Sequence, residues 1–480
     1  MMRKSKSAAK RHKRIWIFLF LFALICLIVF AAFLLWNRNG EDKNEPLPTD
    51  TQAVETTAQT IIVTEKTLTG IVRETAMNTL TVDTADASYV FSIADLISDT
   101  EENNANIGDT VCITYTGVLD ATLSVQTAEV SSVVVKQTAE QKLQEEVEIR
   151  AKEQLSQMSL EEKVGQMFIA RCPSQNAVRA VTTYHPGGYI LFGRDFSNKT
   201  EAQVISDIQS YQDASNIPLF IGVDEEGGTV NRVSTNPNLR ASPFLSPQAL
   251  YATGGMELIR SDTQEKSELL HKLGINLNFA PVCDVSQNPN DFIYDRSFGK
   301  DAEQTAEYVS TVVGEMKRQQ MGSVLKHFPG YGNNADTHTG VAYDNRPYDT
   351  FLSSDFLPFQ AGIEQGADMV LVSHNIVNCM DPSLPASLSA KVHEILRKDL
   401  DFQGVIITDD LAMQGVRAFA DDSRVAVQAV LAGNDLLCCT DFETQIPAVI
   451  AAVENGEITQ ERIDASVLRI LILKISLGLL

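Results

Sequence analysis

The most apolar stretch of the chain lies close to its N-terminus. Residues 15–36 carry no charge and are long enough to cross the roughly 30 Å hydrocarbon core of a bilayer as a helix. Residues 1–14 hold seven basic residues and no acid, which predicts a short cytoplasmic tail. A cleaved signal peptide is the alternative, but its apolar region would be shorter and would end in small residues, whereas Trp36 closes this one. The pattern predicts a single-pass membrane anchor with the rest of the chain extracytoplasmic.

Three further segments precede the bulk of the chain. Residues 37–59 contain two prolines, several polar residues and no aromatic residue, so we expect a disordered linker. Residues 60–136 alternate short β-rich runs with turn residues, which predicts a small all-β module without an evident role. Residues 137–157 repeat an apolar residue every fourth position, from Leu143 to Leu155, which predicts an amphipathic connecting helix.

The region 158–480 has a different rhythm, in which short apolar runs alternate with longer helical stretches. The predicted strands are 164–171, 188–192, 219–224, 275–285, 323–327, 368–373, 405–409 and 435–438. Eight strands alternating with helices over this length are typical of an α/β fold of the (β/α)8 barrel type. A doubly wound sheet is the alternative, but no GxGxxG motif follows the first strand. We therefore expect a barrel as the catalytic domain.

Composition narrows the classes of partner. The chain has 39 basic and 62 acidic residues and a formal net charge of −23, which disfavours nucleic acid as a partner of the folded part. The hydrophobic content of 44% is that of a globular protein. The seven cysteines are scattered and form no CxxC pair, so they predict small core residues rather than a disulfide framework.

Charged side chains gather at the predicted carboxyl ends of the strands, which face the active site in a barrel of this type. These strand ends carry Asp224, Glu225, Glu226, Asp284, Lys326, His327, His374, Asp409 and Asp410. Because acidic and basic ends of four or more strands converge on one mouth, they predict a polar ligand site rather than a feature of stability alone.

Several of these strand ends carry motifs that resemble glycoside hydrolase family 3, in its β-N-acetylhexosaminidase branch. Residues 326–332 read KHFPGYG and are followed by Asp336-Thr337-His338, which resembles the KHFPGHG…DSH signature of that branch. Further matches, in the order of the family, are DEEGG at 224–228 with Arg232, FAPVCD at 279–284, RSFG at 296–299 and TDDLAM at 408–413. The resemblance covers about residues 160–480 and none of residues 1–150.

The resemblance implies a retaining mechanism and a role for each matching residue. Asp409 would be the nucleophile that forms a covalent glycosyl-enzyme, with Asp410 as the less favoured choice. His338 would be the general acid/base, and Asp336 would orient its imidazole. The residues expected to bind the hydroxyl groups of the sugar are Asp224, Arg232, Arg296, Lys326 and His327. No cofactor and no metal are implied.

Alternatives remain at several of these positions. His327, His338 and Asp336 are candidate metal ligands, although no HExxH motif accompanies them. Lys326 is a candidate Schiff-base lysine. Glu225, Glu226 and Asp410 are the other acid/base candidates. Tyr331 and Thr229 stand where the branch commonly has His and Arg, and both are expected at the rim of the site.

The combined expectation is a membrane-anchored, extracytoplasmic exo-β-N-acetylhexosaminidase that releases terminal β-linked N-acetylglucosamine from peptidoglycan- or chitin-type oligosaccharides. Its expected partners are the glycan and, through the N-terminal helix, the membrane, while protein partners are not indicated. A family 3 β-glucosidase and a non-catalytic binding protein of cell-wall glycans are the two alternative functions.

Overall fold

The structure is a computed structural model that describes residues 64–96, 105–334, 340–421 and 423–480. The predicted anchor at 15–36 and linker at 37–59 lie outside the described residues, as do the candidates Asp336 and His338. Among the helices that are described, none is long and apolar enough to cross a membrane.

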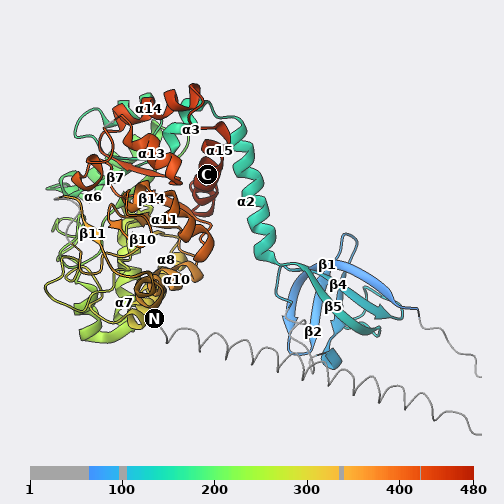
Figure 1. The fold of residues 1–480 in the computed structure, drawn as a ribbon. Helices are drawn as coiled ribbons and strands as arrows, with labels where there is room; N and C mark the ends of the chain where they lie inside the picture. The colour runs from blue at the N-terminus through green and yellow to red at the C-terminus, as the bar shows by residue number, and fades with distance from the viewer. Residues whose placement is uncertain (1–63, 97–104, 335–339, 422) are drawn as a thin grey trace, which may run out of the picture. The chain divides into compact units, whose positions relative to one another are not determined.

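The first described region is a five-stranded antiparallel sheet with the strand order β3-β2-β1-β4-β5 (Figure 1). Its strands are β1 (Lys66–Ala76), β2 (Thr79–Asp83), β3 (Ser88–Ser92), β4 (Thr110–Thr116) and β5 (Glu129–Gln137). Alternate residues of β4 are buried, as expected for a strand with one face on a core. Val82, Phe91, Val111 and Ile113 form the centre of that core.

A single helix, α2 (Ala139–Ser156), follows the sheet. Thr138 caps it through a capping box with Gln141, which satisfies the first backbone amides of the helix. The predicted apolar stripe is only partly correct, because Leu143 is exposed whereas Ala151 is buried between the half-buried Val147 and Leu155. Only the C-terminal half of the helix therefore buries an apolar face.

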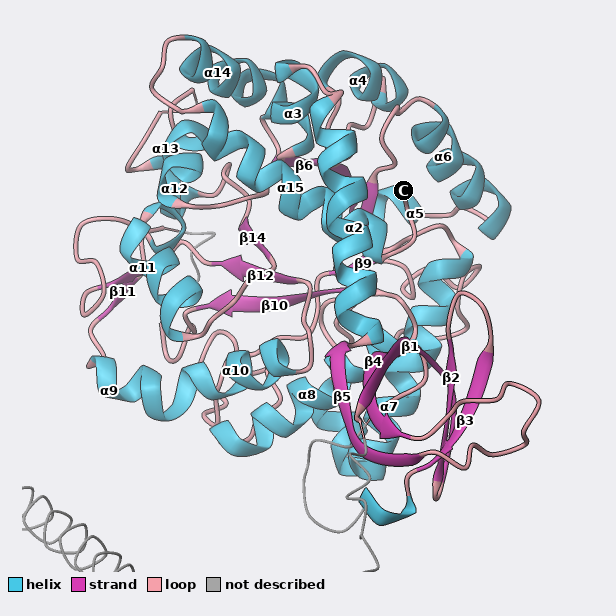
Figure 2. Cartoon of the chain, turned by 90° about the vertical axis from the view of Figure 1, so that its right-hand side faces the viewer, coloured by secondary structure: helices cyan, strands magenta, loops and turns pink. Residues whose placement is uncertain are grey.

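The remainder of the described chain is an eight-stranded parallel sheet in the order β14-β12-β10-β9-β8-β7-β6-β15. A parallel bridge between Ile407 and Leu436 joins its two end strands, so that the sheet closes as the predicted (β/α)8 barrel. The strands are β6 (Phe168–Arg171), β7 (Gly188–Leu191), β8 (Phe220–Val223), β9 (Leu277–Asn278), β10 (Gly322–Phe328), β12 (Met369–Val372), β14 (Val405–Thr408) and β15 (Leu437–Cys439). Every residue of β7, β8, β12 and β14 is buried, because the helices cover the outside of the barrel (Figure 2).

The helices of the barrel follow the strands in sequence. The longer ones are α4 (Ala177–Tyr184), α6 (Glu201–Asp213), α7 (Pro247–Lys272), α8 (Ala302–Arg318), α10 (Phe356–Glu364), α13 (Val425–Ala432), α14 (Phe442–Glu454) and α15 (Gln460–Ser476). Short helical segments are α3 (Leu160–Gln166), α5 (Gly193–Phe196), α9 (Tyr348–Thr350), α11 (Ala390–Glu394) and α12 (Gln414–Arg417). A two-stranded parallel ribbon of β11 (Tyr343–Asp344) and β13 (Ile376–Val377) lies in the loops after β10 and β12.

Two of the predicted strands are wrong in extent. Residues 160–166 form α3 rather than the start of a strand, because Ser159 and Glu162 make a capping box that opens a helix. The predicted strand 275–285 shrinks to β9, since Pro281 has no amide hydrogen with which to continue the ladder. Only an isolated bridge between Val282 and Lys326 continues the pairing.

Candidate active site

A cavity of about 250 Å³ opens at the carboxyl ends of the barrel strands. It is lined by Asp409 and by all five residues predicted to bind the sugar, namely Asp224, Arg232, Arg296, Lys326 and His327. The lining also includes Arg171, Phe192, Glu226, Phe279, Asp410 and Met413, of which only Glu226 and Asp410 were candidates from the sequence. The barrel thus brings together residues that are more than 230 positions apart in the sequence.

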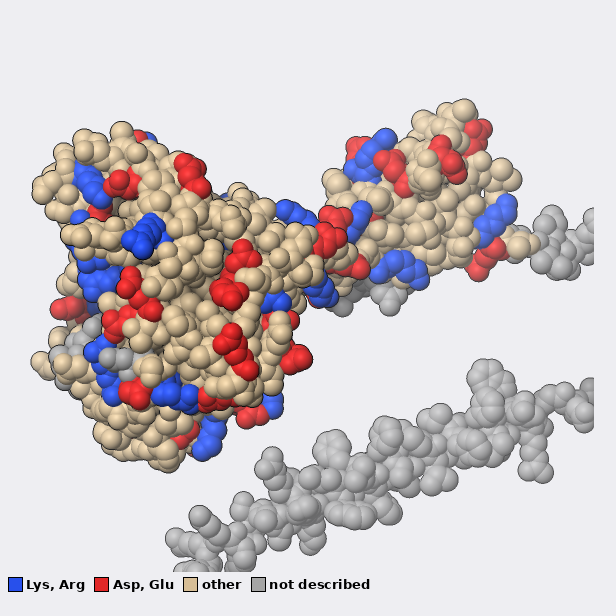
Figure 3. Space-filling model, turned by 90° about the horizontal axis from the view of Figure 1, so that it is seen from above, with Lys and Arg blue, Asp and Glu red and all other residues tan. Residues whose placement is uncertain are grey.

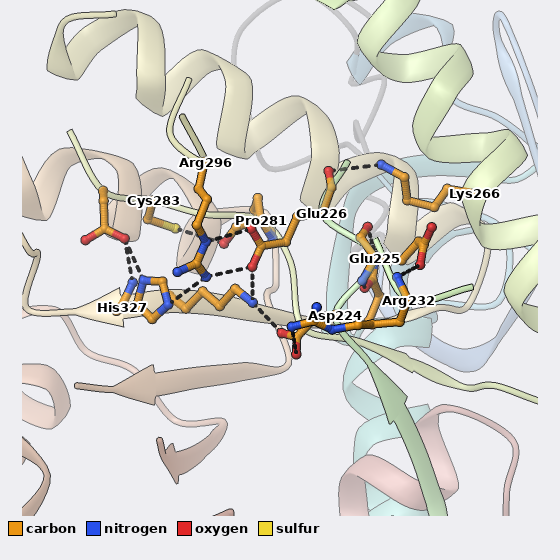
Figure 4. Close-up of polar contacts among 12 residues, drawn as sticks. Asp224, Glu225, Glu226, Arg232, Lys266, Pro281, Cys283, Arg296 and His327 are labelled. Carbon is orange, nitrogen blue, oxygen red and sulfur yellow. Dashed lines mark hydrogen bonds and ion pairs between the residues drawn. The ribbon is translucent and has the colours of Figure 1, made fainter. Parts of the chain in front are cut away.

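A buried network of charges holds one wall of this cavity (Figure 4). Lys326 Nζ lies 2.7 Å from Asp224 Oδ1 and 2.6 Å from Glu226 Oε1. Arg296 donates two hydrogen bonds to the Glu226 carboxylate, from Nε at 3.0 Å and from Nη2 at 2.8 Å. Since a planar guanidinium matches a carboxylate in two bonds, the network fixes the orientation of the Asp224 and Lys326 side chains that line the cavity.

The network also sets the protonation states of its members. Burial alone would raise the pKa of Glu226, but Lys326 and Arg296 hold that pKa well below its ordinary value. Burial would lower the pKa of Lys326, but Asp224 and Glu226 raise it. Lys326 therefore stays protonated, which disfavours the Schiff-base alternative, and Glu226 stays ionised, which disfavours it as a general acid.

His327 is held in one tautomer by its two neighbours. Its Nδ1 lies 2.7 Å from Asp284 Oδ2, and its Nε2 lies 3.2 Å from Arg296 Nη2. Because a guanidinium only donates, Nε2 must accept, and the ring proton on Nδ1 is donated to Asp284. Both nitrogens are thus engaged, which disfavours His327 as a metal ligand; no cluster of three or more metal-ligating side chains occurs in the described part of the chain.

Glu225 has a structural task that the sequence did not reveal. Its buried carboxylate accepts the backbone amides of Arg232 at 2.7 Å, Val233 at 2.7 Å and Ser234 at 3.1 Å, together with the Ser234 hydroxyl. These bonds fold the segment after the DEEGG motif back toward the strand end. The hydrogen bonds of the Glu225 carboxylate thus position Arg232 at the cavity.

The neighbouring acids Asp409 and Asp410 differ in what their carboxylates contact. Asp410 Oδ1 accepts the amides of Ala412 at 2.9 Å and Thr440 at 3.1 Å, and its Oδ2 accepts the Thr440 hydroxyl. This carboxylate therefore ties the loop after β14 to the end of β15. Asp409 lines the same cavity, and its Oδ1 accepts the amide of Asp410 at 2.8 Å. The geometry favours Asp409 as the group that addresses a ligand.

Two other sequence candidates turn out to be packing residues. His374 is buried, with Nδ1 2.7 Å from the Ser387 hydroxyl and Nε2 3.0 Å from the Asp410 carbonyl, so it supports the β14 loop rather than lining the cavity. Tyr331 was expected at the rim, but it is only 1% exposed and packs edge-on against His327 with ring centroids 5.1 Å apart. Thr229 is exposed.

The described ends of the segment that carries Asp336 and His338 are held by one arginine. Arg346 binds Asp344 through Nη2 at 2.7 Å and Asp355 through Nη1 at 2.9 Å, and it donates to the Gly330 carbonyl at 3.1 Å. Gly330 has a φ of 120°, and a Cβ there would lie 2.3 Å from Asp355, so this close approach requires glycine. Arg346 thus holds the backbone at Gly330 close to its own side chain.

Comparison with known proteins identifies one family for the barrel. The profile of the glycosyl hydrolase family 3 N-terminal domain matches residues 159–473. A beta-hexosaminidase of Xanthomonas campestris pv. campestris is 36% identical over 230 residues, which are 47% of this chain and 68% of that protein. A beta-hexosaminidase of Haemophilus influenzae is 34% identical over 284 residues, which are 58% of this chain and 79% of the relative.

A solved structure has a similar fold. The glycoside hydrolase family 3 beta-N-acetylglucosaminidase from Paenibacillus sp. str. FPU-7 superposes with a TM-score of 0.62 and 34% sequence identity. The match covers 67% of this chain and 63% of the Paenibacillus chain, so the matched region spans less than two thirds of that protein.

Proposed function

This chain belongs to glycoside hydrolase family 3, and we propose that it is a retaining exo-β-N-acetylhexosaminidase that removes terminal β-linked N-acetylglucosamine. The observation that carries the proposal is the cavity in which Asp409 faces a wall of fixed hydrogen-bonding groups. The names of the relatives, beta-hexosaminidase and beta-N-acetylglucosaminidase, support the choice of sugar.

The size of the cavity supports action at a chain end. Its volume of about 250 Å³ lies below the range of roughly 300–1,000 Å³ that is usual for pockets of drug-sized ligands. Such a space suits one monosaccharide rather than an extended oligosaccharide. Asp224, Lys326 and Arg296 present ionic donors and acceptors at fixed positions, which suit the hydroxyl groups of a sugar.

The proposed reaction begins with attack of Asp409 on the anomeric carbon. A covalent glycosyl-enzyme forms as the bond to the leaving oxygen breaks, and that oxygen takes a proton from the general acid. Water, deprotonated by the same group, then displaces Asp409 from the opposite side, so that the released sugar keeps its β configuration. Two easier substitutions replace one difficult substitution.

The acid/base role is assigned to His338 with Asp336 as its orienting partner. Support comes from the three rival carboxylates, because each has another task among the described residues. Glu226 is kept ionised by Lys326 and Arg296, Glu225 accepts a set of loop hydrogen bonds, and Asp410 ties two strand ends together. An imidazole whose ordinary pKa is about 6.5 suits a group that must give and then take a proton.

We also propose that the enzyme is anchored in the cell membrane by residues 15–36, with the barrel on the extracytoplasmic side. The charge asymmetry around this segment supports the topology. Acidic and basic side chains are interspersed over the barrel face in Figure 3 rather than gathered in a basic patch, which disfavours a nucleic acid as the ligand. The proposed natural substrates are peptidoglycan- or chitin-type oligosaccharides.

A panel of nitrophenyl glycosides tests the proposed activity. The full-length protein, extracted in detergent, should hydrolyse the β-N-acetylglucosaminide much faster than the β-glucoside, and the first product should be the β-anomer by NMR. A preference for the β-glucoside would instead support a family 3 β-glucosidase. Hydrolysis of neither substrate, together with binding of wall fragments, would support a non-catalytic binding protein.

A further inference from the structure

The turn that carries Glu226 to the proposed sugar cavity is supported by a buried lysine of α7. Lys266 Nζ donates to the main-chain carbonyl of Glu226 at 3.3 Å. The Glu226 carboxylate, in contrast, accepts from Arg296 and Lys326 at the cavity, so that different groups hold the two ends of this residue (Figure 4). Gly227 lies against the same amine, since a Cβ there would be 3.8 Å from Lys266 Nζ. Lys266 therefore supports the backbone from which the Glu226 side chain extends.

The ammonium group of Lys266 is buried together with one acid. Asp262, one helical turn earlier on α7, lies 3.0 Å from Lys266 Nζ, and the two side chains are only 9% and 10% exposed. The centroid of the Phe244 ring lies 5.0 Å from the same nitrogen. Buried ion pairs are costly to desolvate, and an apolar pair of similar size is often as stable. The contact with Glu226, rather than stability, is therefore the feature of this pair that calls for a function.

Packing alone does not hold the turn at Glu226. A small cavity of about 20 Å³ adjoins it and is lined by Glu226, Lys266, Asn278 and Tyr308, among other residues. This volume is enough for about one water molecule, so the residues around it have room to shift. The hydrogen bond from Lys266 opposes such a shift of the Glu226 backbone.

A shift of Glu226 would reach the sugar through two cations. Its carboxylate lies 2.6 Å from Lys326 Nζ and accepts two hydrogen bonds from Arg296, and Lys326 in turn lies 2.7 Å from Asp224. These three residues are among those expected to bind the hydroxyl groups of the sugar. Because hydrogen bonds weaken steeply when their geometry is poor, a small displacement of Glu226 should weaken binding of the sugar.

We propose that Lys266 is a positioning residue for the sugar cavity and acts through the main chain of Glu226. It does not itself line that cavity. The inference rests on the proposed glycosidase function, and it adds α7 to the elements that determine the affinity for the sugar. The competing explanation is that Lys266 only stabilises the fold by pairing with Asp262.

Removal of one or both charges separates the two explanations. Lys266→Met loses the donor to Glu226 and leaves Asp262 buried without its cation. Asp262→Asn keeps the donor but leaves Lys266 without its anion, and the double variant Lys266→Met/Asp262→Asn loses the donor without leaving a buried charge. If Lys266 positions Glu226, affinity for the sugar follows the donor, whereas stability follows the unpaired charge.

Steady-state kinetics of the full-length enzyme measure the affinity. The substrate is the nitrophenyl β-N-acetylglucosaminide and the inhibitor is N-acetylglucosamine, at a temperature where circular dichroism shows each variant to be folded. In both variants without the lysine, KM and the inhibition constant should rise about tenfold, as expected for a lost hydrogen bond from a charged group, and kcat should change less. Both constants should stay near their original values in Asp262→Asn. The double variant should melt at a higher temperature than Lys266→Met.

Lys163→Met is the matched control. Lys163 is also buried and lies 2.8 Å from the acid Asp464, but it belongs to α3 and does not line the sugar cavity. Its loss should lower the melting temperature while KM and the inhibition constant stay unchanged.

Either of two results would overturn the inference. If the double variant had the same constants as the unaltered enzyme, Lys266 would serve only the ion pair. If Lys163→Met raised the constants as much as Lys266→Met, the effect would be a general loosening of the barrel. Failure of the unaltered enzyme to cleave the nitrophenyl substrate is a separate outcome, which would refute the proposed function and the inference with it.

Discussion

At the scale of single residues, the acidic pair after β14 shows how adjacent carboxylates take different roles. Both line the cavity, but the Asp410 carboxylate accepts hydrogen bonds from Ala412 and Thr440, whereas Asp409 Oδ1 accepts the amide of Asp410. Neighbouring residues at a strand end point in different directions, so we expect only one of the two carboxylates to address the sugar squarely. We therefore expect Asp409→Asn to affect mainly catalysis and Asp410→Asn to affect mainly stability.

Asp409→Asn should abolish turnover while leaving the fold intact. The amide keeps the shape of the side chain but cannot form the glycosyl-enzyme, so kcat should fall by several orders of magnitude, on the order of 10³ or more. A fluorosugar inactivator should label Asp409 in the unaltered enzyme, as read by peptide mass spectrometry. Asp410→Asn is the matched comparison: it should lower the melting temperature and retain a larger share of activity. Labelling of Asp410 would make our assignment wrong.

His338→Ala should discriminate between leaving groups. If His338 protonates the departing oxygen, its loss should slow alkyl glycosides by about 10²-fold or more, and activated nitrophenyl glycosides much less, because a phenolate leaves with little protonic help. Asp336→Asn should give a milder loss of the same kind, since the imidazole remains but is less well oriented. Equal losses on all substrates, with an unchanged melting temperature, would return the search to the carboxylates.

At the scale of structural elements, a buried ionic cluster around Arg346 connects described residues on either side of positions 335–339. Arg346 joins Asp344, Asp355 and the Gly330 carbonyl, and thereby connects the end of β10 with the turn that precedes α10. Burial raises the pKa of Asp355 to about 6, although Arg346 opposes the shift. The stability of this cluster should therefore depend on pH between about 4 and 7.

Asp355→Asn should remove one component of the pH dependence of stability. The folded-state pKa of Asp355 is about 6, above its ordinary value of 3.8, so between these values the folded state binds more protons and the free energy of unfolding falls as pH rises. Asparagine does not titrate. The stability of the variant relative to the unaltered protein should therefore improve from about pH 4 to about pH 7, by roughly 2–3 kcal/mol on top of a pH-independent offset from replacing a protonated carboxyl group by an amide.

Denaturant titrations across this range measure the effect. Asp349→Asn is the control, because Asp349 is an exposed acid on the preceding turn and its removal tests the loss of one charge from the same element. Its stability relative to the unaltered protein should stay constant across the series. A relative stability of Asp355→Asn that is constant, or that declines as pH rises, would contradict the assignment.

The elements also show which parts of the fold the sequence could predict. The rhythm of apolar runs and helices is a local property, and it predicted the barrel correctly. The errors at 164–171 and 275–285 came from local chemistry that overrides hydrophobicity, namely the Ser159–Glu162 cap and the missing amide of Pro281. Motif spacing likewise brought Asp224, Arg296 and Lys326 into one expected site.

What the sequence could not predict depends on pairs of residues far apart in the chain. The contacts of Glu226 with Arg296 and Lys326 span 70 or more positions and determine which acid stays ionised. Arg171 belongs to none of the sequence motifs, and only the structure shows that it lies beside Phe192 and lines the cavity. The structural tasks of Glu225 and Asp410 were hidden for the same reason, because an acidic motif does not reveal which acid binds the backbone.

At the scale of the whole molecule, the proposed topology places a very acidic protein on one side of a membrane and a basic tail on the other. The net charge of −23 includes the seven basic residues of 1–14, so the part beyond residue 36 is still more acidic. Anionic lipid would repel such a surface. Attachment to the membrane would then depend on residues 15–36 alone, with 37–59 as a flexible spacer.

Trypsin added to intact cells, or to spheroplasts where an outer membrane is present, tests this topology. The spacer contains Arg38 and Lys43, which are cleavage sites in a segment expected to be unstructured, whereas the next basic residue, Lys66, lies in strand β1. Brief digestion should therefore release an active fragment that begins at residue 39 or 44 and leave the first 38 or 43 residues in the membrane. The double variant Arg38→Gln/Lys43→Gln should stay attached under the same conditions.

Protection of the barrel from external protease would contradict the outward topology, and an active protein released without protease that begins after residue 36 would contradict the anchor. Because cleavage changes attachment but not the barrel, activity on the nitrophenyl substrate should move from the membrane to the supernatant without a change in KM.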